Sequence, residues 1–213
     1  MSQTMRVINK DQEFNCRPFK PKGPQCFYSE ANILTLLRLC LSLTFFVLAI
    51  IRRDPTYNFI GLGIHWLGDM LDGFWARKFK QETILGAEID IIADRIETLF
   101  FYVIFLQFRP WLYFPVAVYI IDFAFVDFYL SYQFLKFDII SPNYFYKVDR
   151  TVYLLNFSPV GKFCNSAVVT LILIFFPHLQ IVAILFAFGL ISIKVFSIHL
   201  LNKKKEVDIS HFS

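Results

Sequence analysis

The chain has 213 residues, of which 56% are hydrophobic and 27 are phenylalanine, and its mean hydropathy is +0.52. This composition excludes a large soluble domain and is typical of a polytopic membrane protein. The formal net charge of +4 comes without interleaved basic and aromatic residues, so we expect no nucleic-acid binding.

The polar N-terminal segment, residues 1–30, contains three prolines that would break a long helix. We expect it to be cytoplasmic, either loose or with a short helix on the membrane surface. An apolar run at 32–51 follows, with Ser29 as its predicted N-cap. This run is too long for a signal peptide and lacks a small-residue cleavage site, so we expect it to be retained.

Five further apolar runs are each close to the length that crosses a bilayer, about 20 residues. They are 57–77, 84–107, 111–135, 159–177 and 179–201. We therefore predict an all-α integral membrane protein with six transmembrane helices. The predicted domains are a helical domain at 31–202 and a basic tail at 203–213.

Positive charge predicts the orientation of these helices. The segments on the side of the two termini carry 14 lysines and arginines, whereas the other side carries three, Arg52, Arg53 and Arg109. Both termini and the polar cavity described next should therefore face the cytoplasm.

Four aspartates interrupt the second and third runs at fixed spacing. Asp69 and Asp72 precede a short loop, and Asp90 and Asp94 follow it. Each pair lies on one helical face, and a short loop makes the two helices antiparallel neighbours. Carboxylates this close to a bilayer are costly, and oxygen ligands suit Mg²⁺ or Mn²⁺. The spacing predicts a divalent-metal site near one membrane face.

The full pattern from Asp69 to Asp94, D-x2-D-G-x2-A-R-x8-G-x3-D-x3-D, resembles the signature of the CDP-alcohol phosphatidyltransferase family at every position. The run Asn32-x2-Thr35-x2-Arg38-Leu39 resembles the start of the family's first membrane helix. The resemblance implies transfer of a substituted phosphate from a CDP-linked donor to an alcohol, with release of CMP, in phospholipid biosynthesis. It also implies a homodimer formed through membrane helices.

The resemblance assigns roles to individual residues. Asp69, Asp72 and Asp90 are expected to bind metal, as two ions of Mg²⁺ or Mn²⁺, and Asp94 is expected to be the general base that also touches a metal. The residues expected to meet the donor nucleotide are Asn32, Gly73, Ala76, Arg77, Thr83 and Gly86. Thr83 could equally be a helix cap. For Arg77, the alternative is a positive charge at the membrane interface.

The sequence specifies the acceptor alcohol less clearly than it specifies the metal and donor sites. The compact six-span form resembles the bacterial and phosphatidylinositol-type branches of the family, which implies CDP-diacylglycerol as donor. Lys147, Arg150 and Lys162 are candidate ligands for a phosphorylated acceptor. Gly161-Lys162 is similar to the glycerol-phosphate branch, whereas Ile91 and Arg95 depart from it. We place glycerol 3-phosphate ahead of inositol or inositol phosphate as the acceptor.

Other polar residues leave alternatives open. Glu97 is expected to hold Arg95 or a neighbouring helix, and His65 to be packed rather than a metal ligand. Asp122 and Asp127 could pair with Arg95 or line an acceptor cavity. A divalent-cation transporter is the alternative from another class, although the chain has no internal repeat and its carboxylates cluster at one face. An inactive membrane scaffold is a further alternative, disfavoured by the complete signature.

Overall fold

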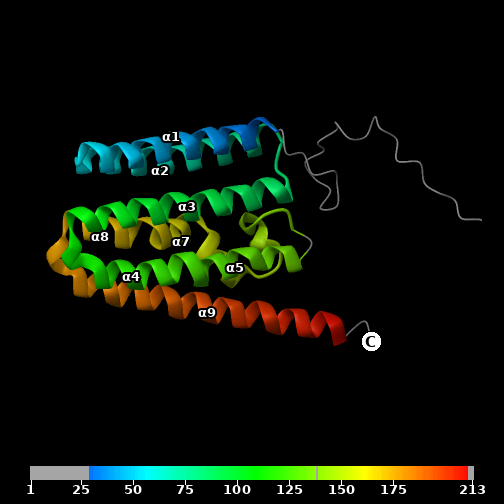
Figure 1. Cartoon of the computed structure of the whole chain (residues 1–213). Helices are drawn as coiled ribbons and strands as arrows, with labels where there is room; N and C mark the ends of the chain where they lie inside the picture. Colours follow the sequence, from blue (N-terminus) through cyan, green and yellow to red (C-terminus); the bar gives the residue numbers. More distant parts are fainter. Residues whose placement is uncertain (1–28, 138, 211–213) are drawn as a thin grey trace, which may run out of the picture.

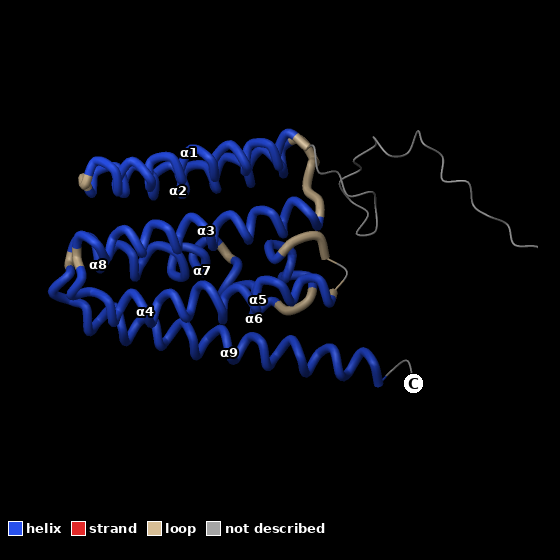
Figure 2. The backbone as a smooth tube through the Cα atoms, viewed as in Figure 1, coloured by secondary structure: helices blue, strands red, loops and turns tan. Residues whose placement is uncertain are grey.

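The computed structural model describes residues 29–137 and 139–210, and every regular element among them is a helix (Figure 2). Most of the expected N-terminal segment, residues 1–28, lies outside the described residues. Part of the expected tail, residues 203–210, belongs to the last helix instead, because that helix continues to Ser210.

The first three helices begin at capping residues and are uninterrupted. They are α1 (Glu30–Arg52), α2 (Pro55–Lys78) and α3 (Ile84–Phe108). The predicted cap Ser29 accepts a hydrogen bond from the Asn32 amide at 3.1 Å. Asp54 and Thr83 cap α2 and α3 in the same way, and each cap satisfies an amide that a helix start leaves free.

The rest of the chain forms three composite helical rods. The first contains η2 (Pro110–Leu112), α4 (Tyr113–Ile121), η3 (Asp122–Asp127), α5 (Phe128–Tyr132) and η4 (Gln133–Lys136). The second contains η5 (Pro142–Lys147), α6 (Arg150–Val152), η6 (Tyr153–Phe157), α7 (Pro159–Phe163), η7 (Cys164–Val168) and α8 (Val169–Phe175). The third contains η8 (Pro177–Leu179) and α9 (Gln180–Ser210). Three of these segments, η3, η6 and η7, are π-helical turns.

Four helical stretches of the described chain are long and apolar enough to cross a membrane. They are Glu30–Arg52, Pro110–Lys136, Arg150–Phe175 and Pro177–Lys204. The helices α2 and α3 have comparable lengths, 24 and 25 residues, but they carry the aspartates and other polar residues and are not among the four. The four apolar stretches indicate an integral membrane protein.

The helices run side by side along one long axis, with α1 and α2 together, α3 beside them and α9 at the far edge (Figure 1). A cluster of buried aromatic and aliphatic residues fills the end where α1 turns into α2, with Phe46, Phe101 and Tyr119 at its centre. A second cluster around Leu130 and Phe145 supports the other end. The polar site lies in the half of the bundle where α2 ends and α3 begins.

Candidate active site

A polar cavity of about 210 Å³ opens between the first three helices and the composite rods. All four aspartates line it, Asp69 and Asp72 from α2, Asp90 and Asp94 from α3. The loop between α2 and α3 is short, so these helices are neighbours and their acidic faces meet. Asp69, Asp72 and Asp90 each offer a carboxylate oxygen within 4.8 Å of the other two.

A buried arginine from α1 lies among these carboxylates. The Arg38 side chain is only 2% exposed, and its Nη2 donates to Asp94 Oδ1 at 2.9 Å. Its two terminal nitrogens also lie within 3.4 Å of carboxylate oxygens of Asp69, Asp72 and Asp90. Arg38 therefore joins the acidic faces of α2 and α3 through a single guanidinium group.

Space for Arg38 is provided by a glycine of α2. A Cβ built on Gly68 would lie 2.4 Å from Arg38 Cγ and 2.5 Å from Arg38 Cδ. Any side chain at this position would displace the aliphatic part of the arginine. The sequence of the second apolar run gave no reason to select Gly68, because its partner lies 30 positions away on another helix.

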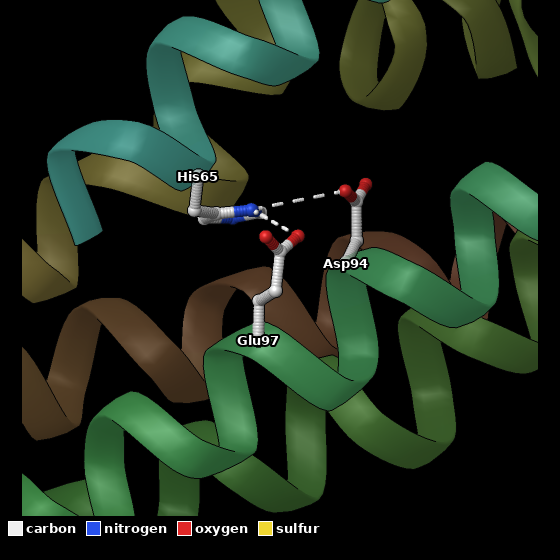
Figure 3. Close-up of side chains that lie close together, drawn as sticks. All are labelled: His65, Asp94 and Glu97. Carbon is white, nitrogen blue, oxygen red and sulfur yellow. Dashed lines mark hydrogen bonds and ion pairs between the residues drawn. The ribbon is translucent and has the colours of Figure 1, made fainter. Parts of the chain in front are cut away.

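Glu97 is the most deeply buried carboxylate of the acidic site and lies one turn beyond Asp94 on α3 (Figure 3). Its carboxylate is fully buried and binds Ser42 Oγ at 2.5 Å and His65 Nδ1 at 2.8 Å, and Arg38 Nη2 lies 3.3 Å away. The predicted contact to a neighbouring helix is therefore present, although it involves α1 and α2 rather than Arg95.

His65 links Glu97 to the aspartates. It is buried, and its Nδ1 lies 4.0 Å from Asp94 Oδ1 as well as 2.8 Å from Glu97 (Figure 3). His65, Asp94 and Glu97 are close enough to hold an ion. Both oxygens of Glu97 already have protein partners, so we interpret His65 and Glu97 as a hydrogen-bonded pair beside Asp94 rather than as metal ligands.

The six residues expected to meet the donor nucleotide all line the same cavity. They are Asn32, Gly73, Ala76, Arg77, Thr83 and Gly86. Thr83 is also the cap of α3, because its Oγ1 accepts from the Gly86 amide at 2.9 Å.

The two glycines of this set allow close approaches. A Cβ at Gly86 would lie 2.7 Å from Asn32 Oδ1, so the glycine lets α1 approach α3. A Cβ at Gly73 would lie 3.2 Å from Arg77 Nη1, which shows that the guanidinium folds over this glycine.

The three candidate acceptor residues occupy different surroundings. Lys162 is exposed and lines the cavity. Lys147 is exposed with its Nζ 4.8 Å from the Tyr144 ring centroid, and Arg150 is an exposed residue at the start of α6. Neither is among the residues that line the cavity.

The charged residues of η3 pair with other helices. Asp127 accepts from Arg95 Nη2 at 2.5 Å, which confirms the pairing with Arg95, and its other oxygen lies 3.2 Å from Lys194 Nζ. Asp127 also lines the cavity. Asp122 pairs instead with Lys194 of α9, at 2.6 Å, and both side chains are fully buried. The sequence gave no sign of Lys194, because it lies alone in the last apolar run.

A comparison with protein families identifies the family of the chain. The model of the family described as CDP-alcohol phosphatidyltransferase matches residues 28–192, which include every helix that lines the cavity. The chain belongs to the CDP-alcohol phosphatidyltransferase family. Family membership and the four apolar stretches together make it an integral membrane protein.

One curated relative of this phosphatidyltransferase family is the CDP-diacylglycerol–glycerol-3-phosphate 3-phosphatidyltransferase of Cereibacter sphaeroides. It is 33% identical over 106 residues, which cover 47% of this chain and 48% of the relative. The chain thus spans about half the length of the curated relative it matches. No solved structure matches the chain.

Members of this family use divalent metal ions, and the residues of the cavity fit such ions. At formal charges, five carboxylates surround the single positive charge of Arg38, so four negative charges remain. Asp72 Oδ2 is buried and accepts no hydrogen bond. An excess of hard oxygen ligands of this kind is suited to Mg²⁺ or Mn²⁺.

Proposed function

We propose that the protein transfers a phosphatidyl group from CDP-diacylglycerol to a polyol phosphate such as glycerol 3-phosphate, with release of CMP. The observation that carries this proposal is the meeting of the four signature aspartates in one cavity, between two adjacent helices. The glycerol-3-phosphate activity for which the relative from Cereibacter sphaeroides is named supports the choice of acceptor. A phosphatidylinositol or inositol-phosphate synthase is the alternative within the family.

Asp69, Asp72 and Asp90 are the proposed metal ligands, with Asp94 at the edge of the set. The four uncompensated negative charges correspond to two divalent ions. Such ions, when bound, would neutralise the pyrophosphate and stabilise the CMP leaving group.

Asp94 is the proposed general base. Its Oδ1 is held by Arg38 at 2.9 Å, and the carboxylate is 24% exposed in the cavity, so it can meet an incoming hydroxyl. The acceptor oxygen would attack the phosphorus that carries the diacylglycerol, and the bond from that phosphorus to the CMP oxygen would break. The hydroxyl proton would pass to Asp94.

The other residues have binding roles in this proposal. Arg77 would hold phosphate oxygens with its forked donors, while Asn32, Gly73, Ala76, Thr83 and Gly86 would form the nucleotide surface. Lys162 is the preferred contact for the acceptor phosphate because it lines the cavity. The role of Lys147 and Arg150 as acceptor ligands remains a prediction.

The membrane arrangement is also proposed. The similar lengths of α2 and α3, 24 and 25 residues, and of the four apolar stretches, 23 to 28 residues, support six spans within a domain at 31–202. The bias of basic residues supports cytoplasmic termini and a cytoplasmic cavity. The homodimer remains a prediction from the family.

The test uses purified protein in lipid nanodiscs with CDP-diacylglycerol, Mn²⁺ or Mg²⁺, and a panel of acceptors. The panel contains glycerol 3-phosphate, inositol, inositol 1-phosphate, serine and ethanolamine. We expect metal-dependent CMP release with one acceptor, glycerol 3-phosphate first. Metal transport across vesicles without CMP release from any acceptor would instead support the transporter.

A further inference from the structure

One wall of the cavity is polar but carries few charges. It is formed by α5, η6, η7 and the segment before η5, and it presents serine and asparagine side chains. Those used below are Ser141, Asn156, Asn165 and Ser166. The signature does not include this wall, so its chemistry needs an explanation of its own.

The side-chain amide of Asn156 has hydrogen-bond partners for its nitrogen but none for its oxygen. The side chain is 2% exposed, and its Nδ2 donates to Val152 O at 3.1 Å and to Ser197 Oγ at 2.8 Å. A backbone carbonyl only accepts hydrogen bonds, so the NH₂ group must face Val152 and the oxygen must face away from it. Asn156 Oδ1 is buried and receives no hydrogen bond.

Asn165 repeats this arrangement. It is 7% exposed, and its Nδ2 donates to the backbone oxygen of Asn156 at 3.2 Å. Because this backbone oxygen only accepts hydrogen bonds, the NH₂ group of Asn165 must face it. Asn165 Oδ1 is also buried and receives no hydrogen bond. A buried acceptor that lacks a donor costs free energy, and both asparagines line the cavity, so a hydroxyl bound there would supply the missing donors.

The local backbone keeps the two asparagines together. Ser158 and Pro159 start α7 directly after η6. A Cβ on Gly161 would lie 2.8 Å from Leu155 O and 3.0 Å from the Asn156 backbone, so only glycine allows α7 to approach η6 this closely. This explains the glycine of Gly161-Lys162 independently of any branch of the family.

The chemistry of the ligand follows from what these oxygens accept. Hydroxyl groups donate hydrogen bonds, whereas phosphate and carboxylate oxygens do not. Lys162 lines the same cavity and has no ion pair among the described residues, and its positive charge disfavours a cationic acceptor such as ethanolamine. The wall therefore suits an uncharged or anionic molecule with several hydroxyls.

We propose that Asn156 and Asn165 determine acceptor specificity by accepting hydrogen bonds from hydroxyls of a polyol acceptor that do not react. This inference rests on the proposed function and deepens it, because it separates polyols from acceptors that carry one hydroxyl only. Ser141, whose buried Oγ also lacks a partner, lies in the same wall and can contribute a further contact.

The experiment compares two acceptors that differ in one non-reacting hydroxyl, glycerol 3-phosphate and propane-1,3-diol monophosphate. In the wild type, we expect kcat/KM to be about tenfold or more lower for the second compound. In Asn156→Leu or Asn165→Leu, we expect kcat/KM for glycerol 3-phosphate to fall while that for the diol monophosphate changes little. The ratio between the two acceptors should therefore approach one in at least one variant.

Two controls separate specificity from misfolding. The KM for CDP-diacylglycerol should stay within about threefold of the wild type in an informative variant. Ser192→Ala should keep the wild-type ratio, because the Ser192 hydroxyl is exposed on α9 outside the cavity and donates to Phe188 O at 2.9 Å. Ser166 is not used as a control, because its hydroxyl donates to Lys162 O but still accepts hydrogen bonds in the cavity wall. If inositol or its phosphate is the better acceptor, the same comparison uses its deoxy analogue.

The outcomes distinguish the two proposals. CMP release with equal efficiency from both acceptors in the wild type, or an unchanged ratio in both asparagine variants, overturns the specificity inference and leaves the transferase intact. The absence of CMP release from every acceptor overturns the proposed function and the inference together.

Discussion

Asp90 and Asp94 lie one turn apart on α3, yet we expect different consequences when each loses its charge. An amide cannot take a proton from a hydroxyl, so Asp94→Asn should lower CMP release by about 10²-fold or more. It should keep CDP-diacylglycerol binding. Asp90→Asn should also weaken Mn²⁺ binding, by about tenfold, which is 1.4 kcal/mol. Near-normal CMP release from Asp94→Asn would show that the base is another group.

Arg38 is the residue whose charge competes most directly with a metal ion. Its guanidinium contacts carboxylates from both α2 and α3, so its removal increases the repulsion between them and the attraction for cations. We expect Arg38→Met to lower the Tm of metal-free protein in EDTA and to raise Mn²⁺ affinity about threefold or more.

Titration of Mn²⁺ by electron paramagnetic resonance measures this affinity, and thermal unfolding measures the stability. Arg52→Met is the matched control, because Arg52 belongs to the same helix but is exposed at its far end. A lower Mn²⁺ affinity in Arg38→Met than in the control would mean that Arg38 positions the ligands rather than balancing their charge.

At the scale of helices, the approach of α1 to α2 depends on a missing side chain. Gly68→Ala would place a Cβ 2.4 Å from Arg38 Cγ, whereas a Cβ at Gly63, in the same helix, meets nothing within 4 Å. We expect Gly68→Ala to cost about 1–3 kcal/mol through overpacking. Gly63→Ala should be neutral or stabilising by about 0.5–1 kcal/mol. Equal Tm values for the two variants in detergent would contradict this account of the helix contact.

The helices themselves were largely predictable from the sequence. Caps and apolar length are local signals, so Ser29 and the approximate limits of most helices could be located. The fifth run was the exception, since the apolar helical stretch that contains it begins at Arg150 and Ser158 caps a segment inside this stretch.

The parts of the site that depend on tertiary packing were not predictable. The convergence of the aspartates could be expected from a short loop, but the position of Arg38 requires the crossing of three helices. The π-helical turns η3, η6 and η7 depend on packing between rods. They set the surroundings of Asp127, Asn156 and Asn165, and no single stretch of sequence specifies them.

At the scale of the whole molecule, the bias of basic residues predicts which ends face the cytoplasm. The loop after α2 and the turn after α1 lie at opposite ends of the bundle (Figure 1). In a cysteine-free background, Lys80→Cys should be protected from a membrane-impermeant maleimide in intact cells. Arg53→Cys should be labelled. The reverse pattern of labelling would invert the proposed topology.

The central claim is that acids from α2 and α3 share cations that contact the pyrophosphate of the donor. Electron–nuclear double resonance on Mn²⁺-loaded protein with CDP-diacylglycerol measures this contact through the coupling between Mn²⁺ and phosphorus-31. We predict a resolved coupling in the wild type that is lost in both Asp72→Asn and Asp90→Asn. A coupling that survives either substitution, or is absent from the wild type, would contradict the shared site.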